Sequence, residues 1–193
     1  MCQNSRARNE DSAAHPTRTP ETGTLPSDCQ AQTLGVTFFD LSRIGQWASS
    51  EEDQRTACFF QEFYVLAAEH IDPAGGRIVN FMDDAGMAVF PVEAAEKVIF
   101  ALADLADAAR RCAAGYRRDT YLNVSVHVGP VLAGSFGPKG AERFDVIGKT
   151  VNIAARLGRR GLTLSAQAFR CLGPDGRKRF QKILQPISYR FRP

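Results

Sequence analysis

Residues 142–157, ERFDVIGKTVNIAARL, predict a short strand that turns at Gly148 into a helix rich in Val, Ile and Ala. Along that helix Lys149, Asn152 and Arg156 fall on one face, because they are spaced at i, i+3 and i+7. Their helical neighbours are apolar, so we expect the helix to be largely buried. A buried amide or guanidinium without a partner is costly, so this polar stripe must meet a ligand or another polar surface.

A carboxylate lies next to the polar stripe. Asp145 is on the incoming strand, just before the turn, so an acceptor, an amide and a cation meet at one strand–helix corner. Two interpretations of Asn152 and Arg156 remain open from these residues alone. They bind a ligand, which makes the corner a candidate site, or they form a contact between helices or between two copies of the chain.

The preceding residues predict strands and helices in a definite order. Apolar runs rich in β-formers alternate with helical stripes of Phe, Leu, Val and Ala. The expected elements are a strand at 34–40, a helix at 42–70, a hairpin at 77–91 that turns at Asp83–Gly86, a helix at 91–114 and a half-buried strand at 122–128. This is the β-α-β-β-α-β order of a ferredoxin-like α+β core, to which we expect a C-terminal strand–helix extension.

Shorter elements and a tail complete the expected organisation. Gly129 and Pro130 predict a turn, after which residues 131–136 pair back. The extension is expected to contain a strand at 163–165, a helix at 166–172 and a hairpin at 180–191. Residues 1–33 hold few large apolar side chains, so we expect a disordered tail or linker, and residues 34–193 are expected to form one domain.

The composition argues against several classes of protein. Hydrophobic residues make up 44% of the chain and charged residues 23%, as in soluble globular proteins, and the net charge of +3 gives no reason to expect nucleic-acid binding. No apolar run approaches the roughly 20 residues that span a bilayer, and the N-terminus lacks a signal-peptide core. We therefore expect a cytoplasmic protein without direct membrane insertion. The five cysteines are scattered and odd in number, which predicts reduced thiols.

Two aspartates are candidates for a metal site. Asp40 ends the first predicted strand and Asp84 lies at the tip of the predicted hairpin. These strands are often neighbours in a β-α-β-β unit, so the two carboxylates are expected to converge at one end of the sheet. Hard oxygen ligands of this kind suit Mg²⁺ or Mn²⁺. The alternative interpretation is a helix N-cap for Asp40 and an ordinary turn residue for Asp84.

Three motifs occur in an order that favours the first interpretation. They are VTFFDL around Asp40, FMDDAGMAVF around Asp84, and VHVGPVLAGSFG followed by RFDVIGKTVNIAARL at residues 126–137 and 143–157. Together they resemble the catalytic domain of the class III nucleotidyl cyclases, the adenylyl and guanylyl cyclases. The resemblance covers roughly residues 34–157, with the order and spacing of the motifs kept.

The resemblance implies a composite site in a head-to-tail homodimer, or in a heterodimer with another cyclase chain. One subunit would supply Asp40 and Asp84 to two divalent ions, Mg²⁺ or Mn²⁺. The other would supply Asp145 to the purine amino group, and Asn152 and Arg156 to the ribose and the transition-state charge. The implied reaction is attack of the ribose 3′-hydroxyl of ATP on the α-phosphate, which gives 3′,5′-cyclic AMP and pyrophosphate for intracellular signalling.

The chain departs from the family pattern at three positions, and a fourth family position has only a candidate match. Asn80 stands where adenylyl members usually have a purine-selecting lysine, and Asp83 replaces a usual glycine. Arg43 lies in the expected phosphate-binding loop, where it either contacts phosphate or blocks its approach. Lys182 is the candidate for the polyphosphate-binding lysine. ATP remains the expected substrate, because Asp145 accepts a hydrogen bond from an amino group.

These departures leave alternatives open. A cyclase with a relaxed choice between ATP and GTP is one, because an asparagine at position 80 has a shorter reach than lysine and no charge. The other is a catalytically weak nucleotide-binding or regulatory module with the cyclase fold.

Overall fold

The computed structural model describes residues 24–44, 53–158, 161–184 and 187–192. Strands, helices and one 3-10 turn alternate along it. They are β1 (Gln30–Leu41), α1 (Asp53–Ile71), β2 (Arg77–Met82), β3 (Ala85–Pro91), η2 (Val92–Ala94), α2 (Ala95–Gly115), β4 (Leu122–Phe136), β5 (Arg143–Ile147), α3 (Lys149–Arg156), β6 (Leu162–Leu164), α4 (Ala166–Arg170), α5 (Pro174–Lys178), β7 (Phe180–Leu184) and β8 (Ile187–Phe191).

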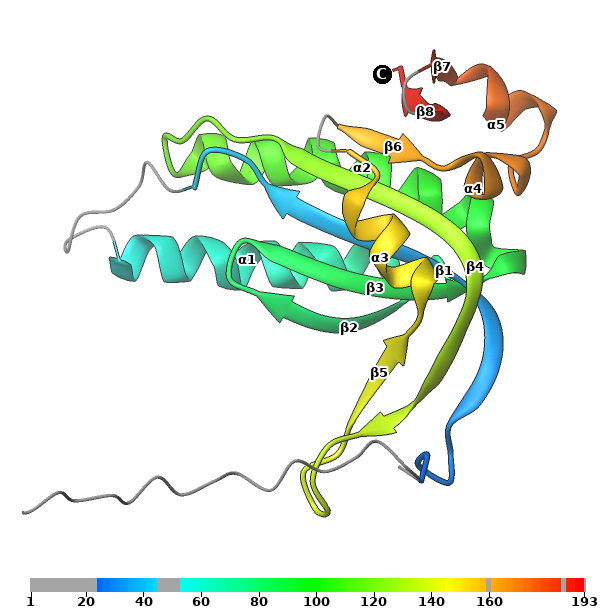
Figure 1. Cartoon of the computed structure of the whole chain (residues 1–193). Coiled ribbons are helices and arrows are strands. Elements are labelled where there is room, and N and C mark those ends of the chain that lie inside the picture. The colour runs from blue at the N-terminus through cyan, green and yellow to red at the C-terminus, as the bar shows by residue number, and fades with distance from the viewer. Residues whose placement is uncertain (1–23, 45–52, 159–160, 185–186, 193) are drawn as a thin grey trace, which may run out of the picture.

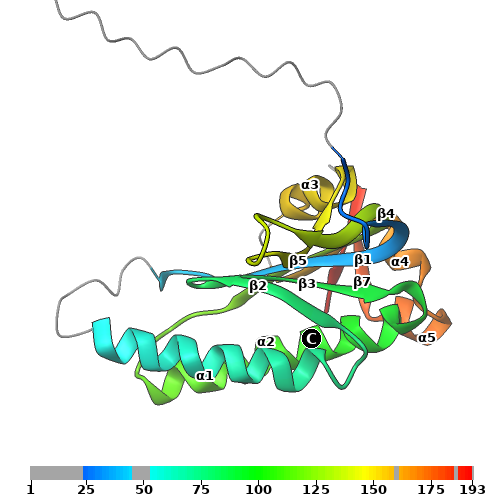
Figure 2. The same cartoon turned by 90° about the horizontal axis from the view of Figure 1, so that it is seen from below.

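Eight strands of the described chain form one sheet. Its order is β2-β3-β1-β4-β6-β8-β7, and β5 pairs with the far end of β4. The first four strands have the ferredoxin-like order, with β1 antiparallel to both β3 and β4, so the predicted fold class is confirmed. Helices α1 and α2 lie together on one face of this sheet, and α3 lies on the other (Figures 1 and 2).

The larger hydrophobic core lies between the sheet and the two long helices. The apolar stripes predicted for these helices face it: Phe59, Phe63 and Ala67 of α1 are fully buried, as are Val98 and Leu102 of α2. Phe39 of β1 packs edge-to-face on Phe63, with ring centroids 6.1 Å apart. Burial of this stripe explains why both helices form, because packing of an apolar face stabilises a helix more than propensity does.

A smaller core lies under α3. It joins Val36 of β1, Val89 of β3, Val131 of β4 and Val146 of β5 to Ala154 of α3. Side chains alternate along a strand, so Val36 and Asp40 project from the same face of β1. Asp40 therefore lies on the α3 side of the sheet, where the helical layer leaves part of the sheet open.

Strand β4 differs from its prediction at Gly129 and Pro130. It runs through both residues to Phe136, so the predicted turn and the separate returning strand are wrong. The hydroxyl of Thr150 donates to the Pro130 carbonyl (2.6 Å), and a Cβ on Gly129 would lie 2.6 Å from that hydroxyl oxygen. The glycine and proline therefore mark the place where α3 packs closely on β4.

The predicted half-buried pattern of β4 is also wrong, because residues 122–129 are buried on both faces. Asn123, Ser125 and His127, the polar residues of that alternating pattern, are 5%, 7% and 4% exposed. His127 lies 2.8 Å from the Ser165 hydroxyl, and burial lowers its pKa. This agrees with a structural role for the histidine.

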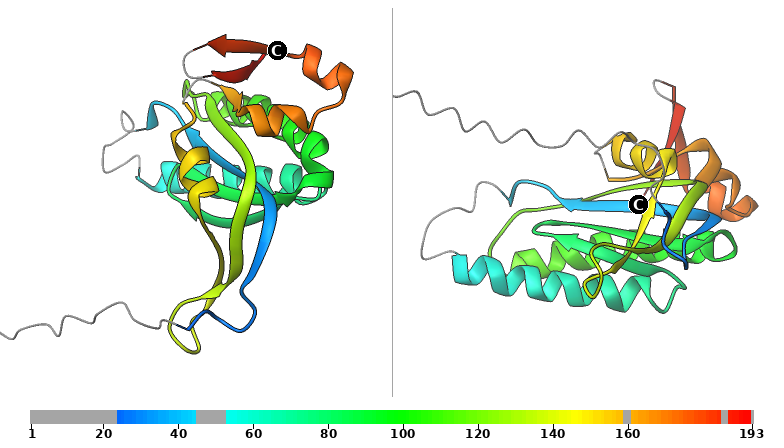
Figure 3. Two further views of the ribbon diagram at one scale, coloured as in Figure 1. Left: turned by 45° about the vertical axis from the view of Figure 1, so that its right-hand side comes forward. Right: turned by 60° about the horizontal axis from the view of Figure 1, so that its bottom comes forward.

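Other boundaries shift by several residues. β1 begins at Gln30, so residues 30–33, expected in the tail, pair with β4 instead. Together with β4 and β5 they form an arm that extends away from the helices (Figure 3). Helix α1 begins at Asp53 and not at 42; residues 45–52 and most of the predicted tail, 1–23, lie outside the described residues. The predicted C-terminal hairpin is confirmed as β7–β8, whereas helix α5 was not predicted.

Candidate functional site

Two carboxylates meet where β1 ends and β2 turns into β3. In the strand pairing Asp40 lies opposite Ala85 of β3, the residue that follows Asp84. The Leu41 amide donates to the Asp84 carbonyl (2.9 Å), which joins the end of β1 to the turn. On its other side Asp40 lies opposite Asn123, whose amide donates to Asp40 Oδ2 (3.1 Å). Three neighbouring strands therefore fix the position of the carboxylate pair.

The carboxylate pair lines a cavity of about 400 Å³. Partial burial, with a contribution from the negative charges of Asp40 and Asp83, raises the pKa of Asp84. Two carboxylates that repel one another while half-buried form a site that a cation would stabilise. No group of three or more His, Cys, Asp or Glu capable of holding a metal occurs among the described residues. The oxygen donors of the two carboxylates fit Mg²⁺ or Mn²⁺, which take hard oxygen ligands and complete their shells with water and substrate phosphates.

The turn that carries Asp84 has a special backbone. Asp83 has a φ of 51°, in the left-handed region where glycine is favoured and aspartate is tolerated. Its carbonyl accepts a hydrogen bond from the Tyr64 hydroxyl (2.7 Å), and the Tyr64 ring stacks on Phe81 at 4.1 Å. Helix α1 therefore holds the two-residue turn in place. The hairpin was predicted with its turn at Asp83–Gly86, whereas Ala85 and Gly86 already belong to β3.

The second group of predicted residues lies beside the middle of β2 and the strand β5. Asn80 and Asp145 line one cavity of about 520 Å³, with Phe81, Phe136 and Phe144 among its walls. The β2–β3 pairing shifts register between Ile78 and Asn80. The Val146 amide donates to Asp145 Oδ1 (2.7 Å), which leaves the other carboxylate oxygen available as an acceptor. One chain therefore brings an amide and a carboxylate together beside aromatic rings.

Beside this cavity an arginine supports β5. The Arg77 guanidinium lies 3.7 Å from the centroid of the Phe144 ring, the residue that precedes Asp145. A cation over an aromatic face is attractive, and here it ties the start of β2 to β5.

Helix α3 is less buried than its sequence predicts. Thr150 and Ala154 are buried, whereas Asn152 and Arg156 are exposed and Ile153 is 45% exposed. The expected burial is therefore wrong for one chain, because α3 packs on the sheet through one narrow side. The polar stripe instead borders an open depression of about 420 Å³, lined by Lys149, Asn152, Ile153, Arg156 and Leu157.

The two sides of α3 face different cavities. Ala155 and Gly158 line the cavity of the carboxylate pair, whereas Asn152 and Arg156 line the depression on the other side. Asn152 and Arg156 lie four residues apart and share a helical face, and Ala155 projects about 100° away from Arg156. Within one chain the polar stripe thus points away from Asp40 and Asp84.

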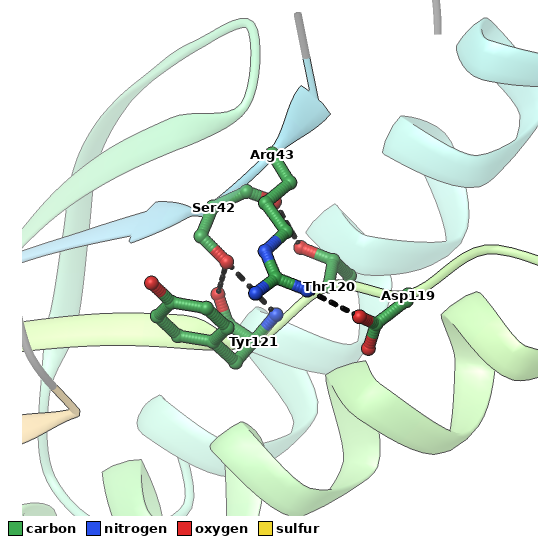
Figure 4. Close-up of polar contacts among 5 residues, drawn as sticks. All are labelled: Ser42, Arg43, Asp119, Thr120 and Tyr121. Atoms are coloured by element: carbon green, nitrogen blue, oxygen red, sulfur yellow. Dashed lines mark hydrogen bonds and ion pairs between the residues drawn. The ribbon is translucent and has the colours of Figure 1, made fainter. Parts of the chain in front are cut away.

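Arg43 follows Asp40 by three residues and has a φ of 63°. Its guanidinium forms an ion pair with Asp119 and lies 5.8 Å from the centroid of the Tyr121 ring (Figure 4). Lys182 is exposed on β7 at the far end of the sheet, with β1, β4, β6 and β8 between β7 and β3. One chain therefore does not bring Lys182 to the carboxylate pair.

Asn123 is a residue of the site that the sequence did not single out. It is one of the polar residues that alternate with apolar ones in β4, and this spacing predicts a strand with one polar face. The signal that could have found it is the pairing of β1 with β4, because in the observed register Asn123 is the direct neighbour of Asp40.

Comparison with protein families gives one extended match. Residues 28–181 match the family described as "Adenylate and Guanylate cyclase catalytic domain". An uncharacterized protein of Mycobacterium tuberculosis strain H37Rv is 29% identical over 133 residues, which cover 64% of this chain and 22% of that protein. An uncharacterized protein of Mycobacterium bovis is 28% identical over 162 residues, which cover 76% of this chain and 28% of that protein. The chain thus spans about a quarter of the length of these relatives.

Two solved cyclase structures superpose on this chain. The structure of the guanylyl cyclase Cya2 superposes with a TM-score of 0.73 at 16% identity, covering 84% of this chain and 92% of that one. The adenylyl cyclase CyaB from P. aeruginosa superposes with a TM-score of 0.70 at 16% identity, covering 86% and 96%. In the described part of this chain no helix is long and apolar enough to cross a bilayer.

Proposed function

Because the chain belongs to the family of adenylate and guanylate cyclase catalytic domains, we propose that it is an adenylate cyclase, which converts ATP into 3′,5′-cyclic AMP and pyrophosphate. The observation that carries this proposal is the shared cavity of Asp40 and Asp84 at the end of β1. The arrangement offers charged oxygen ligands beside open space, as a phosphoryl-transfer site that uses divalent metal ions requires.

Asp40 and Asp84 would hold two divalent ions, Mg²⁺ or Mn²⁺. Bound there, the ions would lower the pKa of the ribose 3′-hydroxyl and neutralise the phosphates. The hydrogen bond from Asn123 leaves Asp40 Oδ1 for a cation and fixes the orientation of the carboxylate. The positive charge of these ions would relieve the repulsion between Asp40 and Asp84.

We propose that a second copy of the chain completes each site. Asn152 and Arg156 are exposed and face away from the carboxylates of their own chain. The exposed Ile153 between them, and Ile147 at 49% exposure before the turn, are apolar surface next to these polar groups. A head-to-tail partner would cover that surface and place Asn152 against the ribose and Arg156 against the charge that develops on the α-phosphate. Pairing with another cyclase chain would use the same surface.

The choice of ATP rests on the cavity that Asn80 and Asp145 share. The free oxygen of Asp145 would accept a hydrogen bond from the adenine 6-amino group, whereas guanine has a carbonyl there. The aromatic walls of that cavity, Phe81, Phe136 and Phe144, suit a purine ring. Lys182, on the same chain as Asp145, would reach the phosphates only in the site built with the partner's carboxylate pair.

The direct test is the reaction of the purified chain with ATP and with GTP, side by side, in Mn²⁺. We expect 3′,5′-cyclic AMP from ATP as the main product. We expect 3′,5′-cyclic GMP to form from GTP at a lower rate. Equal rates would favour a cyclase with a relaxed choice of purine. No product from either nucleotide would remove the enzyme proposal and leave a nucleotide-binding or regulatory module.

A lysine at position 80 is expected to sharpen the choice of purine. An ammonium group donates to the N1 acceptor of adenine, whereas guanine has an N–H at N1. Hydrogen bonds to charged groups exceed neutral ones by about 1 kcal/mol, so Asn80→Lys should raise the ratio of the rates with ATP and GTP about fivefold. Asn80→Gln keeps the amide and serves as the matched control. The same ratio in all three proteins would mean that Asn80 does not touch the base.

A further inference from the structure

Ser42, the residue that follows β1, is hydrogen-bonded to residues 120 and 121, which precede β4. The Ser42 amide donates to the Tyr121 carbonyl (2.9 Å), and the Tyr121 amide donates to the Ser42 hydroxyl (3.1 Å). The Thr120 hydroxyl donates to the Ser42 carbonyl (2.5 Å). Because the Leu41 amide is hydrogen-bonded to the Asp84 carbonyl, the backbone of Leu41 and Ser42 is held from both sides, at the Asp83–Asp84 turn and at residues 120–121. Figure 4 shows the second of these attachments.

The side chain of the next residue is held far less firmly than this backbone. Arg43 and Asp119 form their ion pair at side-chain exposures of 55% and 81%. Exposed ion pairs contribute little, because water competes for both partners and the side chains lose entropy when they are held together. The guanidinium of Arg43 can therefore leave Asp119 without disturbing the hydrogen bonds of Ser42.

Arg43 lies near the cavity of Asp40 and Asp84, so its guanidinium has a second possible partner there. Three residues of chain span at most about 11 Å, so the Arg43 backbone lies close to the Asp40 end of the carboxylate pair. A guanidinium binds phosphate oxygens with a bidentate geometry, and a polyphosphate carries more charge than one carboxylate. A bound polyphosphate is thus a stronger partner for Arg43 than Asp119 is.

We propose that Asp119 is an internal competitor for Arg43: it holds the guanidinium in the free protein and yields it to the polyphosphate of a nucleotide bound beside Asp40 and Asp84. This inference rests on the proposed function, since it takes the cavity of the carboxylate pair as the place where the phosphates bind. Asp119 is a positioning residue in this scheme, and Arg43 is the group that contacts the substrate. When Arg43 is paired with Asp119, the centroid of the Tyr121 ring lies 5.8 Å from the guanidinium.

The test measures the binding of inorganic tripolyphosphate with Mg²⁺ to the full chain by calorimetry. Asp119→Asn should tighten binding about two- to fivefold, the range set by the loss of one exposed ion pair. Arg43→Gly removes the guanidinium, and glycine suits the φ of 63°, so this variant should fold and bind about tenfold more weakly. In the double variant the gain from Asp119→Asn should disappear. Asp175→Asn breaks another exposed ion pair, with Lys178 on α5, and should leave binding unchanged.

Two outcomes would overturn the inference. If Asp119→Asn tightens binding equally with and without Arg43, Asp119 acts by simple repulsion of phosphate. If Asp119→Asn and a second variant, Asp119→Ser, both weaken binding while the urea midpoint is unchanged, the ion pair supports the site instead of competing with it. The readout does not involve cyclisation. An inactive protein with the expected binding pattern would therefore keep the inference and remove the proposed enzyme, and an active protein with the opposite pattern would do the reverse.

Discussion

Asp84→Ala is expected to reduce cyclic AMP formation about a thousandfold while the protein stays folded. The loss follows from the role proposed for the carboxylate, because a metal ligand supports several kcal/mol of transition-state stabilisation and each 1.4 kcal/mol is tenfold in rate. Folding should not suffer. Burial raises the pKa of Asp84, and the charges of Asp40 and Asp83 add to the shift, so the ionised side chain opposes folding at neutral pH. The urea midpoint of Asp84→Ala should equal or exceed that of the parent protein.

A neighbouring aspartate provides the control. Asp83 lies in the same turn, is exposed and has a φ of 51°, so Asp83→Gly removes a charge of the same sign and relieves an unfavourable backbone. It keeps the carbonyl that accepts from Tyr64 and should retain activity within a few fold. Mn²⁺ should raise the melting temperature of the parent protein and of Asp83→Gly, but not that of Asp84→Ala. A large loss in both variants would assign the effect to the turn and not to a metal ligand.

The elements that sequence predicted well are those whose signal is local. The hairpin around Asp84 follows from acidic turn residues between two apolar runs, and the stripes of α1 and α2 follow from helical spacing alone. The same holds for the carboxylate pair, since the order strand, helix, hairpin already places β1 beside β3. Local patterns therefore sufficed for the ferredoxin-like core and for the convergence of Asp40 and Asp84 on one cavity.

The errors arose where a distant segment decides the conformation. Gly129 and Pro130 have the composition of a turn, yet close packing of Thr150 from α3 keeps them within β4. Asn123 has the spacing of a solvent-facing residue, yet its pairing with Asp40 buries it. The ion pair that holds Arg43 joins residues 76 positions apart. None of these contacts leaves a periodic signal in the sequence.

The apolar character of α3 is the most informative of these differences. Its sequence predicted burial, and one chain buries only a narrow side of it. Apolar residues that one chain leaves exposed on a helix are typical of a surface that a second chain covers. In the proposed dimer the polar stripe beside Ile153 would find its partners across that contact, and this would join the two interpretations left open by the sequence: a ligand site and a contact between copies.

Mixing Asp40→Ala chains with Arg156→Ala chains is therefore expected to restore activity that neither variant has alone. In a head-to-tail dimer each site takes Asp40 and Asp84 from one chain and Asn152 and Arg156 from the other. A mixed dimer then has one site with both defects and one site with none. Half of the dimers in an equal mixture are mixed, so about a quarter of the parent activity should return.

The control for this mixture is a pair of defects on the same half of the site. Asp40→Ala mixed with Asp84→Ala should stay inactive, because every site in every dimer lacks one carboxylate. Exchange of subunits can be ensured by dilution and reconcentration before the assay, and confirmed with differently tagged chains. If the first mixture exchanges subunits and stays as inactive as the second, Arg156 and Asp40 act within one chain. The opposite directions in which α3 presents Arg156 and Ala155 would then have to be reconciled by a movement of the helix.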